Sequence, residues 1–114
     1  MTPSLPCDVE ATVTYLPADH GGRTTPVATG YCPQFYYDGM DHGARHSYPD
    51  VERVFPGESA RVFLSFIHPE LQVGKLQPGK PFLIREGHRV LGYGAVTRIV
   101  DLEASAKGQC RVAS

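Results

Sequence analysis

The chain contains the run Gly30-Tyr31-Cys32-Pro33-Gln34-Phe35-Tyr36-Tyr37, which leads directly into Asp38-Gly39. Aromatic side chains are enriched in β-strands, and Asp-Gly is a strong turn dipeptide. The run therefore predicts a short strand that ends in a tight turn.

Further strand candidates lie on both sides of this run. Val9, Ala11, Val13 and Tyr15 alternate with polar residues, which indicates a half-buried strand. The segment Arg61–His68 is apolar on both faces and is predicted to be the most buried strand. The remaining candidates are 43–48, a weak one, then 82–85 and 89–102, the last two joined by Glu86-Gly87-His88.

The distribution of glycine and proline along the chain favours an all-β protein. Twelve glycines and ten prolines divide it into short segments, and no segment shows sustained helical periodicity. About six antiparallel strands without covering helices favour a closed β-barrel, because closure removes exposed edges. Gly92 and Gly94 indicate bends or close backbone approach in the last strand. We expect one domain at 7–103, a flexible leader at 1–6 and a polar tail at 104–114.

Composition limits the possible partners and compartments. Eleven basic and twelve acidic residues give a net charge of −1, without the basic excess typical of proteins that bind nucleic acid alone. Any RNA contact is therefore expected to be weak or part of a larger assembly. The sequence has no signal-peptide pattern and no apolar stretch of about 18 residues. Three cysteines (Cys7, Cys32 and Cys110) fit reduced thiols better than a disulfide framework, so we expect a cytoplasmic protein without membrane contact.

Nucleotide and metal sites are weakly indicated. The pairs Gly74-Lys75 and Gly79-Lys80 lack the spacing of a P-loop and the helix that should follow it, so we expect turns and no GTP binding. His42 and His46 lie four residues apart beside Asp41, which can be metal-ligand spacing. Histidines in a surface hairpin explain the pattern more simply, and no metal is expected.

Catalysis is not indicated either. Cys32 or Cys110 could act as a nucleophile beside a histidine, but nothing local marks either thiol as activated. We therefore predict no enzyme and no cofactor. The aromatic run, with Tyr31 and Tyr48 nearby, could stack nucleobases. Packing in the core or at the rim of the barrel is the interpretation we favour.

Several motifs together resemble the third, C-terminal domain of bacterial elongation factor Tu. They cover about 8–102 and follow that family's order. They are Gly21-Gly22-Arg23-x-Thr25-Pro26, Gly30-Tyr31-x-Pro33-Gln34-Phe35-Tyr36, Pro56-Gly57, Ile67-His68-Pro69 and Ile84-Arg85-Glu86-Gly87-x-Arg89 with Gly92 and Gly94. The resemblance implies a six-stranded antiparallel closed β-barrel.

The resemblance also implies a function without catalysis. In that family the domain contacts the GTPase domain, grips the T-stem backbone of aminoacyl-tRNA and helps to bind the nucleotide-exchange partner. The tRNA-facing positions carry over to Gln34, His68, Glu86, Gly87 and Arg89. Contacts of this kind position RNA without reading its sequence.

Departures from the family pattern leave two functions open. Cys32 replaces a family arginine, His88 replaces a glycine, Val90 replaces a threonine, and 38–48 lacks a Thr-Thr-Asp pattern. The leading hypothesis is a translation-related binding module for aminoacyl-tRNA or for a translation-factor or GTPase partner protein. The alternative is a protein–protein adaptor that has kept the barrel and lost tRNA binding. The position of Met1 and the length of the tail suggest an independent reading frame.

Overall fold

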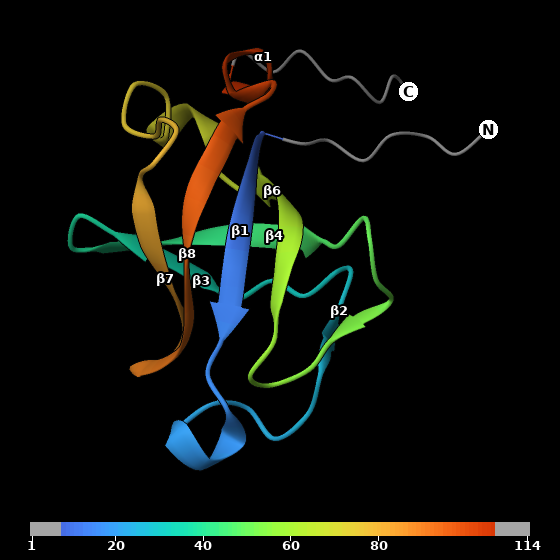
Figure 1. Ribbon diagram of the computed structural model, residues 1–114. Helices are drawn as coiled ribbons and strands as arrows, with labels where there is room; N and C mark the ends of the chain where they lie inside the picture. Colours follow the sequence, from blue (N-terminus) through green and yellow to red (C-terminus); the bar gives the residue numbers. More distant parts are fainter. Residues whose placement is uncertain (1–7, 107–114) are drawn as a thin grey trace.

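The structure is a computed structural model that describes residues 8–106 (Figure 1). These residues form strands joined by turns and three short helical segments. The strands are β1 (Val9–Tyr15), β2 (Val27–Ala28), β3 (Gln34–Tyr37), β4 (Met40–Ser47), β5 (Arg53–Val54), β6 (Ser59–Phe66), β7 (Pro81–Glu86) and β8 (Arg89–Ile99). The helical segments are the 3-10 turns η1 (Ala18–His20) and η2 (Pro69–Leu71) and the helix α1 (Leu102–Ala106).

Six of the strands close into one barrel. Their order around it is β1–β6–β4–β3–β7–β8, and β8 pairs back with β1. Every pairing is antiparallel. The predicted six-stranded antiparallel barrel is therefore confirmed. The short strands β2 and β5 pair only with each other, in a small sheet beside the barrel (Figure 1).

The interior of the barrel is filled by alternate residues of each strand. In β1, Val9, Ala11, Val13 and Tyr15 are all buried, as their alternation predicted. Strand β6 also buries only alternate residues, three of its eight, whereas β1 buries four of its seven, so the prediction that this segment is the most buried strand is wrong. A barrel has one interior, and the outward Phe63 is only partly covered, with the Arg61 guanidinium 5.5 Å from its ring centre.

Two glycines in β8 allow the neighbouring strand to approach. A Cβ atom at Gly92 would lie 2.6 Å from the carbonyl oxygen of Thr14. A Cβ atom at Gly94 would overlap the carbonyl oxygen of Thr12 and the Phe82 ring. Real Cβ atoms do not make such contacts, so the predicted close backbone approach is confirmed.

The Asp38-Gly39 turn joins β3 to β4 as a two-residue hairpin loop. Asp38 has φ 51° and Gly39 has φ 81°, and positive φ at both positions is the mark of a type I′ turn. Strand β4 begins directly after the turn, at Met40, three residues before the predicted start of this weak candidate.

The end of the barrel differs from the prediction. Strand β8 ends at Ile99 rather than at residue 102, and the helix α1 follows it. Asp8 holds this end together, because its carboxylate accepts hydrogen bonds from Phe66 N at 2.8 Å and from Ser105 Oγ at 2.5 Å. A five-residue helix is too short to show periodicity in the sequence.

The predicted leader and residues 107–114 of the predicted tail lie outside the described residues, and the domain boundaries stay predictions.

No helix in the described part of the chain is both long and apolar enough to cross a membrane.

Candidate functional site

The turn between β7 and β8 holds three of the five predicted site residues, Glu86, Gly87 and Arg89. Gly87 has φ 63°, which allows the chain to reverse within two residues. The Arg89 side chain reaches the loop after η1, where its Nη2 atom donates to the carbonyl oxygens of Gly21 (3.1 Å) and Gly22 (3.3 Å). The turn and this loop therefore form one unit at the end of the barrel that is lowest in Figure 1.

Two residues that are distant in sequence hold the Glu86 carboxylate. Arg23 Nη1 and the Tyr31 hydroxyl both donate to Glu86 Oε2, at 2.5 Å and 2.7 Å. The Arg23 guanidinium also lies 5.2 Å from the centre of the Tyr31 ring. Burial raises the pKa of Tyr31, and the hydrogen bond to Glu86 raises this pKa further, so the hydroxyl stays protonated and donates. The sequence-based assignment of site residues missed both Arg23 and Tyr31.

A hollow of about 200 Å³ lies between the turn and the loop. It is lined by Gly22, Arg23, Thr24, Thr25, Glu86 and Arg89. Two guanidinium groups, two hydroxyl groups and one carboxylate therefore surround it. Charge-assisted donors of this kind suit an oxyanion such as a phosphate group.

Gln34 lies on the outer face of the barrel, one strand away from the turn. It pairs with Arg85 of β7 on one side and with Gly43 of β4 on the other. Arg85 lies over the Tyr36 ring at 4.4 Å, and its Nη2 atom donates to the Gly87 carbonyl oxygen at 3.4 Å. Its Nε atom is 3.8 Å from an Asp41 carboxylate oxygen. Gln34 is therefore linked to the turn through Arg85.

His68 lies further from the other predicted residues. It is exposed, it precedes η2, and its Nδ1 atom is 3.3 Å from a Glu70 carboxylate oxygen. The preceding residue, Ile67, donates its N–H to the carbonyl oxygen of Gly43 at 3.0 Å, and Gly43 pairs with Gln34. Three of the five predicted residues thus lie together in the turn. Gln34 belongs to a cross-strand row with Arg85 and Gly43, and His68 stands beyond the Gly43 end of that row.

The two candidate metal-binding histidines have different surroundings. His46 is 1% exposed inside the barrel, so the prediction that it lies in a surface hairpin is wrong. Its Nδ1 atom is 3.0 Å from the Tyr48 hydroxyl, and burial lowers its pKa to about 3. His42 Nδ1 instead meets Gln72 Nε2 at 2.9 Å. Within residues 8–106, no group of three or more His, Cys, Asp or Glu residues is placed to hold a metal ion.

Most of the aromatic run packs in the core. Phe35 stacks on Phe82 with ring centres 4.2 Å apart, and Tyr37 and Tyr48 are also buried. Core packing is therefore confirmed for these residues. Tyr36 and Tyr31 are half-buried at the surface.

The other candidate motifs are also placed by the structure. Gly74 and Gly79 have positive φ in turns, and the strand β7 follows the second of them, so the turn interpretation is confirmed for both Gly-Lys pairs. Cys32 is an exposed free thiol. Cys7 and Cys110 lie outside the described residues.

An apolar strip runs across the outer faces of β8, β7 and β3. Tyr93 pairs with Leu83, and Leu83 pairs with Tyr36, so the three side chains share one face. Val90 extends the strip beside Arg85. Tyr93 is 50% exposed. We call Tyr36, Leu83, Val90 and Tyr93 the apolar wall.

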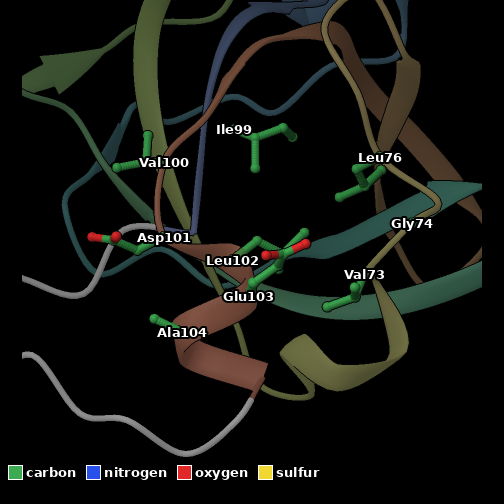
Figure 2. Close-up of a pocket in the computed structure, with 9 residues that line it drawn as sticks. All are labelled: Val73, Gly74, Leu76, Ile99, Val100, Asp101, Leu102, Glu103 and Ala104. Atoms are coloured by element: carbon green, nitrogen blue, oxygen red, sulfur yellow. The ribbon is translucent and has the colours of Figure 1, made fainter.

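A second hollow, of about 450 Å³, lies at the α1 end of the barrel (Figure 2). Figure 2 shows Val73 and Leu76 on one side of it and α1 on another. Its two acidic residues, Asp101 and Glu103, stand at the start of α1, where carboxylates interact favourably with the helix dipole. None of the five predicted site residues lines this hollow.

Comparison with known families agrees with the barrel and the motifs. Residues 5–100 match the family described as Elongation factor Tu C-terminal domain, which is most of the 114 residues.

Proposed function

We propose that this chain, which belongs to the elongation factor Tu C-terminal domain family, is a translation-related module that binds aminoacyl-tRNA. The family supports a non-catalytic binding role of the translation-factor kind, because the GTPase activity of elongation factor Tu lies in another domain that these 114 residues do not include. In this proposal the module works in the cytoplasm and contacts RNA through Gln34, Glu86, Gly87 and Arg89, with His68 at the margin.

The observation that carries the proposal is the joined turn and loop around the 200 Å³ hollow. Arg89 and Arg23 bring two guanidinium groups to its rim, and Thr24 and Thr25 add hydroxyl groups. Gly87 exposes backbone beside them. Donors with this distribution fit phosphate and ribose oxygens, which position RNA without reading its bases.

A filter-binding titration against charged tRNA at several salt concentrations tests the proposal. We expect saturable binding at low salt that weakens as salt rises, because cation–phosphate contacts release counterions. Arg89→Ala should weaken binding and reduce the salt slope by about 0.9 for one lost phosphate contact on a duplex. Arg98→Ala is the matched control, because Arg98 lies on the same strand but pairs with Glu10 (2.8 Å) away from the turn. Absence of saturation at high micromolar protein would contradict tRNA binding.

A second candidate function, a protein–protein adaptor, is favoured by the apolar wall. Two tyrosines lie there beside Arg85, and tyrosine and arginine are enriched at protein interfaces. In this version the partner is a translation-factor or GTPase protein and not RNA. A pull-down with the full chain separates the two functions. Recovery of one protein without tRNA, lost in Tyr93→Ser and kept in Arg98→Ala, favours the adaptor; recovery of tRNA favours the first proposal.

A further inference from the structure

The Tyr31 hydroxyl stands between the buried core and the turn that carries the proposed RNA contacts. It donates to Glu86 Oε2 at 2.7 Å, from 55 residues away in the sequence. The Tyr31 ring packs edge-on against the buried His46 ring, with centres 5.6 Å apart. Tyr31 therefore connects the interior of the barrel to Glu86.

The backbone of Tyr31 is fixed on both sides. Its N–H donates to the Ala28 carbonyl oxygen at 3.0 Å, and its own carbonyl oxygen accepts from His46 N at 2.8 Å. Arg23, the other partner of Glu86, lies in the loop after η1 and divides its donors between Glu86 and Thr25. Tyr31 is thus the partner of Glu86 that is anchored to the barrel itself.

The two donors leave one carboxylate oxygen available. Both Tyr31 and Arg23 bind Oε2, and Oε1 has no hydrogen-bond partner among residues 8–106. The Glu86 side chain is 38% exposed. A carboxylate can accept several hydrogen bonds, so Oε1 can accept one from a ligand hydroxyl or amino group without releasing Tyr31.

We propose that Tyr31 is a positioning residue for RNA binding, and this inference rests on the proposed function. Tyr31 orders the Glu86 side chain before the ligand arrives, so that Oε1 accepts from a ribose hydroxyl of the RNA and the adjoining Gly87 N–H donates to a neighbouring phosphate oxygen. A flexible glutamate would lose its rotamer freedom only on binding, and pre-ordering removes that cost. Tyr31 itself does not touch the RNA.

A double-mutant cycle in the full chain tests whether Tyr31 acts through Glu86. Tyr31→Phe removes only the hydroxyl, and we expect charged-tRNA binding to weaken about fivefold, the effect of one hydrogen bond. Glu86→Gln should weaken binding at least as much, and the double variant should bind no worse than Glu86→Gln alone. Ser59→Ala is the control, because it removes an exposed hydroxyl that bonds Thr14 at 2.7 Å on other strands. Unchanged binding in Tyr31→Phe contradicts the proposal, and so do losses that multiply, since Tyr31 would then contact RNA directly.

A second measurement judges the inference without RNA. NMR relaxation of free Tyr31→Phe should show the Gly87 amide order parameter falling from about 0.85 toward 0.6, with no such change in Ser59→Ala. An unchanged Gly87 order parameter overturns the positioning role, whatever the binding result. If the wild-type chain fails to bind tRNA while the order parameter falls as expected, the proposed function fails and the ordering of the turn by Tyr31 stands.

Discussion

Acid should destabilise this protein through one buried histidine. His46 lies inside the barrel, and Tyr15, Tyr31 and Tyr48 surround its ring. Arg23 and Glu86 stand behind Tyr31 and pair with each other. No carboxylate among the described residues bonds the ring, and its Nε2 atom has no partner there. Protonation would therefore place an unpaired charge and an unpaired N–H donor in the core.

The magnitude follows from the pKa of His46. Burial lowers this pKa from 6.5 to about 3 in the folded protein, whereas the unfolded chain keeps an ordinary value. Between these two values the unfolded state binds more protons, so the free energy of unfolding falls as the pH falls. The slope reaches about 1.4 kcal/mol per pH unit, and the total loss from pH 7 to pH 3 is about 4 kcal/mol. This total is comparable to the whole stability of many small domains.

Urea unfolding at a series of pH values between 4 and 7.5 measures this effect. The matched variant is His46→Leu, which replaces the imidazole with an apolar side chain of similar size. It leaves the Tyr15–Tyr48 hydroxyl contact of 2.6 Å in place. At pH 7.5 we expect the free energies of unfolding of wild type and His46→Leu to differ by about 1 kcal/mol or less. As the pH falls, the free energy of unfolding of the variant should rise steadily relative to that of wild type. A difference between wild type and His46→Leu that is constant over this pH range would refute the reasoning.

Three further predictions concern stability. Gly94→Ala should destabilise the barrel by about 3 kcal/mol or prevent folding, measured by urea unfolding, because the new Cβ would overlap the Thr12 carbonyl oxygen and the Phe82 ring. Asp8→Ala should cost about 1–3 kcal/mol in the same measurement, because the Phe66 N–H would stay buried without its acceptor; a smaller loss would mean that another acceptor replaces the carboxylate. Gly87→Ala should cost only about 1–2 kcal/mol, since φ is 63° but no atom lies within 4 Å of the added Cβ, and a loss as large as that of Gly94→Ala would contradict this geometry.

The strands that alternate cleanly were the ones that sequence could predict. Val9 to Tyr15 is a regular pattern, and the structure buries each apolar member. The segment Arg61–His68 is less buried than its sequence indicates, because Phe63 and Ile67 are apolar but lie outside the core. The Arg61 guanidinium lies over the Phe63 ring, and Ile67, just after β6, is 61% exposed. Hydrophobic periodicity shows which residues are apolar, but it does not show whether each face of the strand lies against the core or against solvent. His46 was misplaced for a related reason, since its neighbours in β4 are polar and only the pairing with Leu64 shows which face is internal.

The candidate site shows the same limit more sharply. The turn residues Glu86 and Gly87 were found because they are adjacent in a motif. Arg23 is 63 residues from Glu86 and Tyr31 is 55, so their convergence depends on the register of β3 with β7 and on the loop after η1. Arg23 belongs to one of the family motifs, but no local pattern indicates that it pairs with a carboxylate 63 residues away. Local sequence patterns therefore cannot predict hydrogen-bond partners that are brought together only by the fold of the whole barrel.

The charges on the barrel surface distinguish one part of its outer face from another. On β1, β6 and β8, Arg98 and Arg61 meet Glu10 at 2.8 Å and 3.7 Å, and Arg61 also meets Asp50 at 2.9 Å. Exposed ion pairs of this kind contribute about 0–1 kcal/mol to stability, but a partner that covers them must remove water from every member. The four residues of the apolar wall are uncharged, and burial of Tyr93 and Leu83 is favourable by itself. A macromolecule that docks on this barrel therefore gains most by approaching over β3, β7 and β8, where the apolar wall borders the turn of Glu86 to Arg89.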